Sequence, residues 1–138
     1  MNTRNKLWLY VFILALPALL ASCNKNRDNL TGEWRLTSLD GIPAVEGSAV
    51  TIRFDGAQVS GFGGCNTYSG GYTTKGGKIE LTDLSMTLMA CQDSELNEQE
   101  TSFFITLNLV DRYTVSQESL SLRSSDVELE FIPAQGQG

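Results

Sequence analysis

The sequence contains no histidine, and this absence excludes several kinds of catalytic site. A Ser-His-Asp triad, a Cys-His pair and a zinc site with histidine ligands each need an imidazole, so none of them can form in this chain. We therefore expect a protein without enzymatic activity, and we predict no catalytic residue, no cofactor and no metal site.

Basic residues are also scarce, with 10 Lys and Arg against 16 Asp and Glu. Because Arg4 and Lys6 fall within the first 22 residues, the rest of the chain has 8 basic and 16 acidic residues, a net charge of −8. Nucleic-acid binding needs clustered Lys and Arg, so we expect no such partner. The same balance argues against adhesion to anionic lipid headgroups through a basic face, and it fits a charge that keeps an envelope protein soluble.

The first 22 residues have the pattern of an export signal. Arg4 and Lys6 precede the apolar stretch Leu7–Leu20, and small residues follow it. The stretch is shorter than the roughly 20 residues that span a bilayer, and Pro17 interrupts it, so a retained transmembrane helix is the weaker interpretation.

The signal ends at a cysteine that we predict to be the lipid attachment site. Leu20-Ala21-Ser22-Cys23 resembles a bacterial lipobox, in which small residues admit a peptidase and the thiol takes a diacylglyceryl group. Cys23 would then begin the mature protein with two or three acyl chains, such as palmitate, which is enough for stable anchoring. Asn24 favours the outer membrane over the inner one, facing the periplasm. Residues 23–30 are polar and predict a tether.

Residues 31–133 are expected to form one mostly β (α+β) domain, followed by a flexible tail at 134–138. Val50, Ile52 and Phe54 alternate with polar residues, as in a half-buried strand, and Asp55-Gly56 is a strong hairpin signal. Short strands are predicted near residues 34–39, 50–54, 58–61, 78–81, 85–89, 113–115, 120–122 and 127–131, with another beginning at residue 72.

The hydrophobic period changes after Cys91. Leu96, Phe103, Leu107 and Val110 share one face at helical spacing, so we predict a helix over residues 95–110, capped by residue 93 or 94. The expected architecture is a small antiparallel barrel or strongly curved sheet of about eight strands, with this helix packed on it. The aromatic core is expected to contain Trp34, Phe54, Phe103 and Phe131.

Acidic residues gather before and within the predicted helix. Asp83, Asp93, Glu95, Glu98 and Glu100 could suggest a calcium site or a catalytic carboxylate pair. They lack EF-hand spacing, and a solvated helix start, where the helix dipole favours anions, is the better interpretation.

Glycines are concentrated in one segment, with eight of the 13 between Gly56 and Gly77. A backbone cradle for an anion is one interpretation, but the segment lacks the Gly-Lys-Ser/Thr sequence of a phosphate loop and no helix follows it directly. Bulges and tight corners in a curved sheet are the favoured interpretation.

Two cysteines remain once Cys23 carries lipid. Cys65 and Cys91 would lie in an oxidising compartment after export, so we predict that they form a disulfide. Its loop of 25 intervening residues would contribute about 3 kcal/mol of stability. Reactive thiols are the alternative, although a Cys-x-x-Cys motif and a histidine partner are both missing.

Two tyrosines follow the cysteine in the glycine-rich segment. Tyr68 and Tyr72 could stack on a ligand such as a sugar, or they could simply pack within the sheet. Together with Asn66 they are our candidate binding surface.

The central motifs resemble the META domain family, which includes HslJ-like envelope lipoproteins. The resemblance rests on Gly-Cys-Asn-Thr-Tyr-Ser-Gly at residues 64–70 and Thr-Leu-Met-Ala-Cys at residues 87–91, and it covers about residues 30–132. The family often has a basic residue where this chain has Leu88. The resemblance implies a compact β-rich fold with one helix and an envelope protein linked to stress or antibiotic tolerance. It implies no enzymatic activity and no catalytic residues.

We therefore predict a non-enzymatic, lipid-anchored cell-envelope protein. It would bind a protein partner or a small apolar ligand in envelope stress tolerance. Two alternatives stay open. One is a thiol–disulfide redox protein that uses Cys65 and Cys91, and the other is an inhibitor of an extracellular hydrolase that uses the glycine-rich loop.

Overall fold

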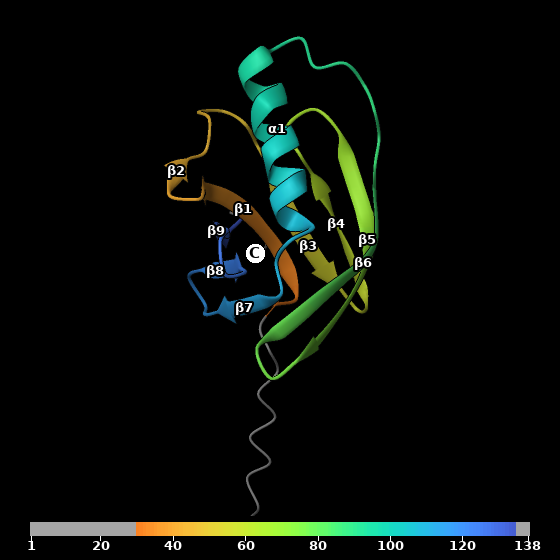
Figure 1. Ribbon diagram of the computed structural model, residues 1–138, viewed down its shortest axis with the longest axis vertical. Coiled ribbons are helices and arrows are strands. Elements are labelled where there is room, and N and C mark those ends of the chain that lie inside the picture. Colours follow the sequence, from red (N-terminus) through yellow and green to blue (C-terminus); the bar gives the residue numbers. More distant parts are fainter. Residues whose placement is uncertain (1–29, 135–138) are drawn as a thin grey trace, which may run out of the picture.

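The computed structural model describes residues 30–134, which form one antiparallel sheet of nine strands and one helix (Figure 1). The predicted signal peptide, lipidated Cys23, the tether up to residue 29 and most of the predicted tail lie outside the described residues. The elements are β1 (Gly32–Leu39), β2 (Ile42–Pro43), β3 (Thr51–Asp55), β4 (Gln58–Phe62), β5 (Thr67–Lys75), β6 (Lys78–Met86), α1 (Ser94–Leu107), β7 (Arg112–Val115), β8 (Leu120–Arg123) and β9 (Glu128–Pro133).

The sheet curves strongly enough for its ends to meet. Strands follow one another in chain order from β3 to β9, and β1 pairs with both β3 and β9. The short β2 pairs only with β1 and is not among the strands that were predicted. Helix α1 is inserted between β6 and β7, which are joined by a single residue pair. The prediction of a curved antiparallel sheet with one helix is confirmed.

Two hairpins turn at glycines, and the first of them is the predicted Asp55-Gly56 hairpin. Asp55 pairs with Gln58, and Gly56 between them has a positive φ of 61°. Lys75 pairs with Lys78, and Gly76 and Gly77 have φ values of 59° and 79°. The second turn thus has two successive residues with positive φ, which match the twist of an antiparallel ribbon, whereas the first has one at Gly56. Glycine adopts this conformation without steric cost.

The glycine-rich segment is more extended than its sequence suggests. Strand β5 begins at Thr67, well before the expected start at Tyr72, and β6 is one strand where two separate strands were predicted. That prediction was wrong because the register shifts between Ser69 and Gly71, and Asp83 in β6 has a φ of 53°. Such a bulge inserts one extra residue and reverses the alternation of side chains, so the sequence pattern looks interrupted.

Helix α1 begins where predicted and ends earlier. The Asp93 carboxylate accepts hydrogen bonds from the backbone N–H groups of Glu95 (2.9 Å) and Leu96 (3.2 Å), which makes Asp93 the N-cap. The helix ends at Leu107, and Val110, expected within it, is buried in the connection to β7. No helix in residues 30–134 is long and apolar enough to cross a membrane.

The core is filled by side chains from the helix and from most of the strands. Trp34, Phe54, Phe103 and Phe131 all lie in one buried cluster, as predicted. The rings of Phe103 on α1 and Phe131 on β9 meet edge to face, with centroids 6.5 Å apart. The helix is therefore fixed against the sheet through this aromatic contact.

Candidate functional site

The main surprise of the structure is a buried carboxylate on the inner face of α1. Glu100 is only 3% exposed, so the prediction that it belongs to a solvated acidic run is wrong. Leu96, Glu100, Phe103 and Leu107 recur at helical spacing, and this geometry directs Glu100 toward the sheet. Its helical spacing with Leu96 and Phe103 indicates the buried face of the helix, but a glutamate is usually exposed, so the spacing alone did not lead to this prediction.

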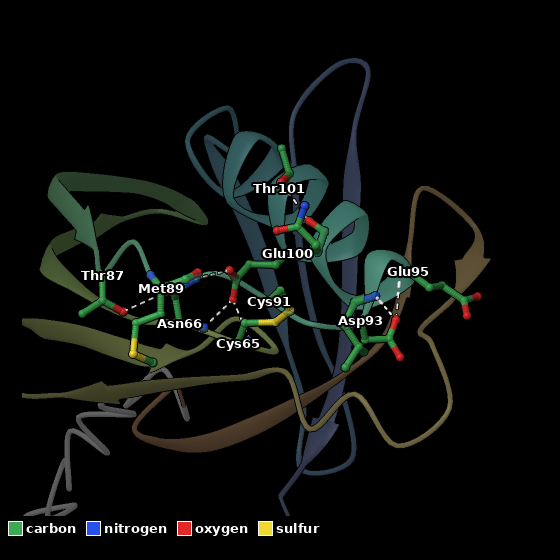
Figure 2. Close-up of a disulfide and its surroundings, with 11 residues drawn as sticks. Cys65, Asn66, Thr87, Met89, Cys91, Asp93, Glu95, Glu100 and Thr101 are labelled. Atoms are coloured by element: carbon green, nitrogen blue, oxygen red, sulfur yellow. Dashed lines mark hydrogen bonds between the residues drawn. A yellow bond between two sulfur atoms is a disulfide. The ribbon is translucent and has the colours of Figure 1, made fainter.

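The glycine-rich segment supplies the hydrogen bonds that Glu100 needs (Figure 2). Its Oε2 accepts from the backbone N–H groups of Cys65 (2.8 Å) and Asn66 (2.6 Å). Its Oε1 accepts from Nδ2 of Asn66 at 2.6 Å. Among the described residues no Lys or Arg is paired with Glu100, so these N–H donors alone compensate its buried charge. The segment does cradle an anion, and that anion is a side chain of the same protein.

Asn66 links this carboxylate to the loop that follows β6. Its Oδ1 accepts from the backbone N–H of Met89 (2.7 Å) and from the hydroxyl of Thr87 (2.9 Å). Its Nδ2 also donates to the carbonyl oxygen of Met89 at 3.2 Å. The amide of a single buried side chain therefore holds both backbone groups of Met89 in place (Figure 2).

The held loop presents two apolar side chains to solvent. Leu88 is 91% exposed and Met89 is 65% exposed, and we call this pair the Leu88–Met89 tip. The backbone N–H of Thr87 donates to the carbonyl of Thr67 on β5 at 3.0 Å, which fixes the start of the loop. The tip is thus an exposed apolar surface whose backbone is held in place by hydrogen bonds.

A disulfide fixes the end of the same loop. Cys65 and Cys91 are bonded, with their Cα atoms 5.7 Å apart, which confirms the predicted pairing (Figure 2). Both cysteines are only partly buried. The disulfide and Asn66 therefore attach the loop to the same short stretch of chain, next to Glu100.

The three residues of the candidate binding surface have different environments. Asn66 and Tyr68 are buried, and the Tyr68 hydroxyl donates to the carbonyl of Thr51 at 2.8 Å. Burial raises the pKa of Tyr68 well above its ordinary value. Tyr72 packs edge to face against Phe54, with ring centroids 4.8 Å apart, and keeps part of its surface exposed. Ligand stacking on Tyr72 stays a prediction.

Close packing explains why glycine occupies two positions near the site. A Cβ atom at Gly63 would lie 2.7 Å from Oε2 of Glu100, and one at Gly61 would collide with the carbonyl oxygen of Thr51 and the ring of Tyr68. Glycine therefore permits the close approach that the buried carboxylate and the buried tyrosine require. The bulges and tight corners predicted for the segment occur elsewhere, at the register shift between Ser69 and Gly71 and at the Gly76-Gly77 turn.

Two open hollows lie on the surface of the described residues. One, of about 530 Å³, opens beside the turn between β5 and β6, and another, of about 460 Å³, lies beside the loop after β2. Within residues 30–134, no three His, Cys, Asp or Glu side chains come together as metal ligands.

Comparison with known proteins identifies relatives of the whole domain. A family model of the META domain matches residues 28–136. An NMR structure of a protein from Burkholderia xenovorans has 26% sequence identity and a TM-score of 0.65, covering 78% of this chain and 85% of that one. A second NMR structure has 24% identity and a TM-score of 0.62, covering 75% and 90%. No curated protein matches the chain significantly.

A more distant likeness shows the fold alone. A DUF4847 family protein from Bacteroides vulgatus has 15% identity and a TM-score of 0.52, covering 78% of this chain and 96% of that one. The family match is the stronger finding, since it spans all nine strands, the helix and the motifs that build the Glu100 network. The chain belongs to the META domain family.

Proposed function

We propose that the protein is a lipid-anchored envelope protein that binds a protein partner through the Leu88–Met89 tip. The observation that carries the proposal is the combination of exposure and rigidity at this tip. Leu88 and Met89 leave most of their apolar surface in water, while Asn66 and the Cys65–Cys91 disulfide hold the backbone beneath them.

Rigidity matters because binding costs conformational entropy. A loop already held in one conformation loses less freedom when it is bound, so more of the contact energy is retained as affinity. Leucine and methionine side chains suit a protein interface, and the flexible thioether of Met89 adapts to the partner's surface. A buried network that fixes the exposed Leu88–Met89 tip therefore lowers the entropy cost of binding a partner there.

The packed interior favours a protein partner over a small apolar ligand. Phe54, Phe103, Phe131 and Ile52 are at most 1% exposed and occupy the space that the sheet encloses. The surface hollows are lined by polar and charged side chains as well as apolar ones. Among the described residues, these side chains occupy the interior in which an apolar ligand would have to bind, whereas a partner protein could cover the exposed tip.

Anchoring through Cys23 is the sequence-based part of the proposal. The lipobox Leu20-Ala21-Ser22-Cys23 ends five residues before the family match begins at residue 28, so the lipid would sit close to the domain. We place the protein on the outer membrane facing the periplasm, and the family resemblance supports a role in envelope stress tolerance.

Crosslinking in the native envelope tests the proposal. The lipidated protein is crosslinked in place and purified, and its captured partners are quantified by mass spectrometry. The double variant Leu88→Gln, Met89→Gln should lose its main partner, because two polar amides replace the apolar contact. Ile42→Gln is the matched control, since Ile42 on β2 is 67% exposed and lies in another part of the fold. Equal capture by the tip variant and the control would contradict the proposal.

A further inference from the structure

Four basic side chains lie opposite one another on four neighbouring strands. Lys75 at the end of β5 is the register partner of Lys78 at the start of β6. Lys78 is in turn the partner of Arg112 at the start of β7, and Arg112 is the partner of Arg123 at the end of β8. All four are exposed, and we call them the cation row.

The cation row is unusual in a domain this acidic. Directly opposed residues share one face of a sheet, and like charges in that position destabilise the pairing. Elsewhere the sheet opposes unlike charges, as in the pair of Glu33 and Arg53. The one ion pair described for the row joins Arg112 to Asp111 at 3.8 Å, and both side chains are largely exposed. The register therefore places four cations side by side, and Asp111 is the one ion-pair partner described for them.

An extended anionic surface fits the row better than a small free anion does. The row lines the 530 Å³ hollow through Lys75, Lys78 and Arg112, but Glu80 and Asp111 line the same hollow and would repel an anion inside it. Glu128, the register partner of Arg123, ends the row with a negative charge. A surface with many separate negative charges can meet the four cations at once without entering the hollow.

The turn between β5 and β6, which carries Lys75 and Lys78, lies near the end of the domain where β1 begins. In Figure 1, β1 begins at the lower end of the molecule, and the turn between β5 and β6 lies at that end too. Only seven residues separate Cys23 from the first residues of the domain, a reach of at most about 25 Å. These seven residues include Lys25, Arg27 and Asp28, a net charge of +1.

We propose that the cation row docks on the anionic headgroups of the membrane that holds Cys23. This inference rests on the anchoring proposed above and adds an orientation to it. Strand β6 leads away from the docked turn for nine residues, a rise of about 26 Å, before the chain reaches the Leu88–Met89 tip. Docking therefore turns the tip away from the headgroups, toward the space where a partner can reach it. Net charge alone argued against a basic face, because it cannot reveal a local row that strand register assembles.

Amine labelling of the lipidated protein on vesicles tests the docking. Lys75 and Lys78 are the only lysines in residues 30–134, so an amine-reactive reagent followed by mass spectrometry reports on the row directly. On phosphatidylcholine vesicles that contain phosphatidylglycerol, their labelling at low salt should be about fivefold slower than on phosphatidylcholine alone. Raising the salt to about 0.5 M should restore the rate, because it screens exposed charges.

Matched variants separate docking from a general charge effect. Arg112→Gln with Arg123→Gln should restore the labelling of Lys75 and Lys78 on anionic vesicles. Arg35→Gln with Arg53→Gln removes the same charge from exposed positions outside the row and should leave the protection intact. Circular dichroism would check that both variants are folded.

The outcomes distinguish docking from anchoring. Protein that stays on both vesicle types with equally labelled lysines would overturn docking alone. Protein that leaves both vesicle types without detergent would overturn the anchoring, and docking with it. Protection that needs added envelope proteins and no anionic lipid would overturn the lipid surface in favour of an acidic protein partner.

Discussion

Oε2 of Glu100 accepts a 2.6 Å hydrogen bond from the backbone N–H of Asn66, a residue 34 positions earlier in the chain. This contact joins the one helix of the domain to its glycine-rich segment through a buried negative charge. Asn66 also forms hydrogen bonds with the backbone of Met89, so Glu100 supports the exposed tip indirectly, through Asn66.

Glu100→Gln should lower the free energy of unfolding by about 2 to 3 kcal/mol. Both oxygens of Glu100 accept from N–H donors, and the amide group of glutamine would face one of those donors with another N–H. Glu98→Gln is the matched control, because Glu98 is exposed and its substitution should change stability by less than about 0.5 kcal/mol. Urea unfolding followed by circular dichroism measures both. Similar losses for the two variants would count against the network.

Gly63→Ala should destabilise the domain by about 1 to 3 kcal/mol, since its Cβ would lie 2.7 Å from Oε2 of Glu100. The same substitution in a Glu100→Ala background should cost less, because the colliding carboxylate is gone. A double-mutant cycle from urea unfolding gives the coupling between the two sites. Additive effects would mean that Gly63 is needed for another reason.

Removing the disulfide with Cys65→Ala and Cys91→Ala should cost about 3 kcal/mol, because the unfolded chain gains the freedom of the opened loop. Dithiothreitol should lower the unfolding midpoint of the wild-type protein and leave that of the double variant unchanged. A wild-type protein whose midpoint does not respond to complete reduction would contradict the stabilising role.

Alkaline pH should destabilise the domain through Tyr68. Burial raises the pKa of Tyr68 well above 10.0, so above about pH 10 the unfolded chain loses a proton that the folded protein keeps. Stability from this group is thus complete below pH 10 and falls by about 1.4 kcal/mol per pH unit above it. The urea midpoint, measured between about pH 9 and pH 11, should depend less on pH in Tyr68→Phe than in the wild-type protein. An unchanged slope in that variant would refute this account.

The sequence predicted the parts of the fold that depend on regular alternation and on turn chemistry. The strand around Val50 to Phe54, the Asp55-Gly56 hairpin and the Asp93 cap all depend on local rules that neighbouring residues satisfy. The Cys65–Cys91 pairing followed from the count of cysteines left after Cys23.

The remaining features depend on contacts between distant segments. The bulge beside Asp83 shifts the alternation of β6, so one strand looked like two. Glu100 looked solvated because its donors, Cys65 and Asn66, lie far away in the sequence. The cation row combines residues from four strands and exists only once their register is known.

Hydrogen exchange at the backbone N–H of Met89, measured by NMR, tests most directly whether the buried network holds the exposed tip. The N–H donates to Oδ1 of Asn66 at 2.7 Å, so it should exchange slowly in the wild-type protein. Glu100→Gln, which loosens Asn66, should accelerate this exchange at least tenfold, equivalent to about 1.4 kcal/mol, while Glu98→Gln should leave it unchanged. A Met89 N–H that exchanges at the rate of an unprotected amide in the wild-type protein, or ignores Glu100→Gln, would contradict the account.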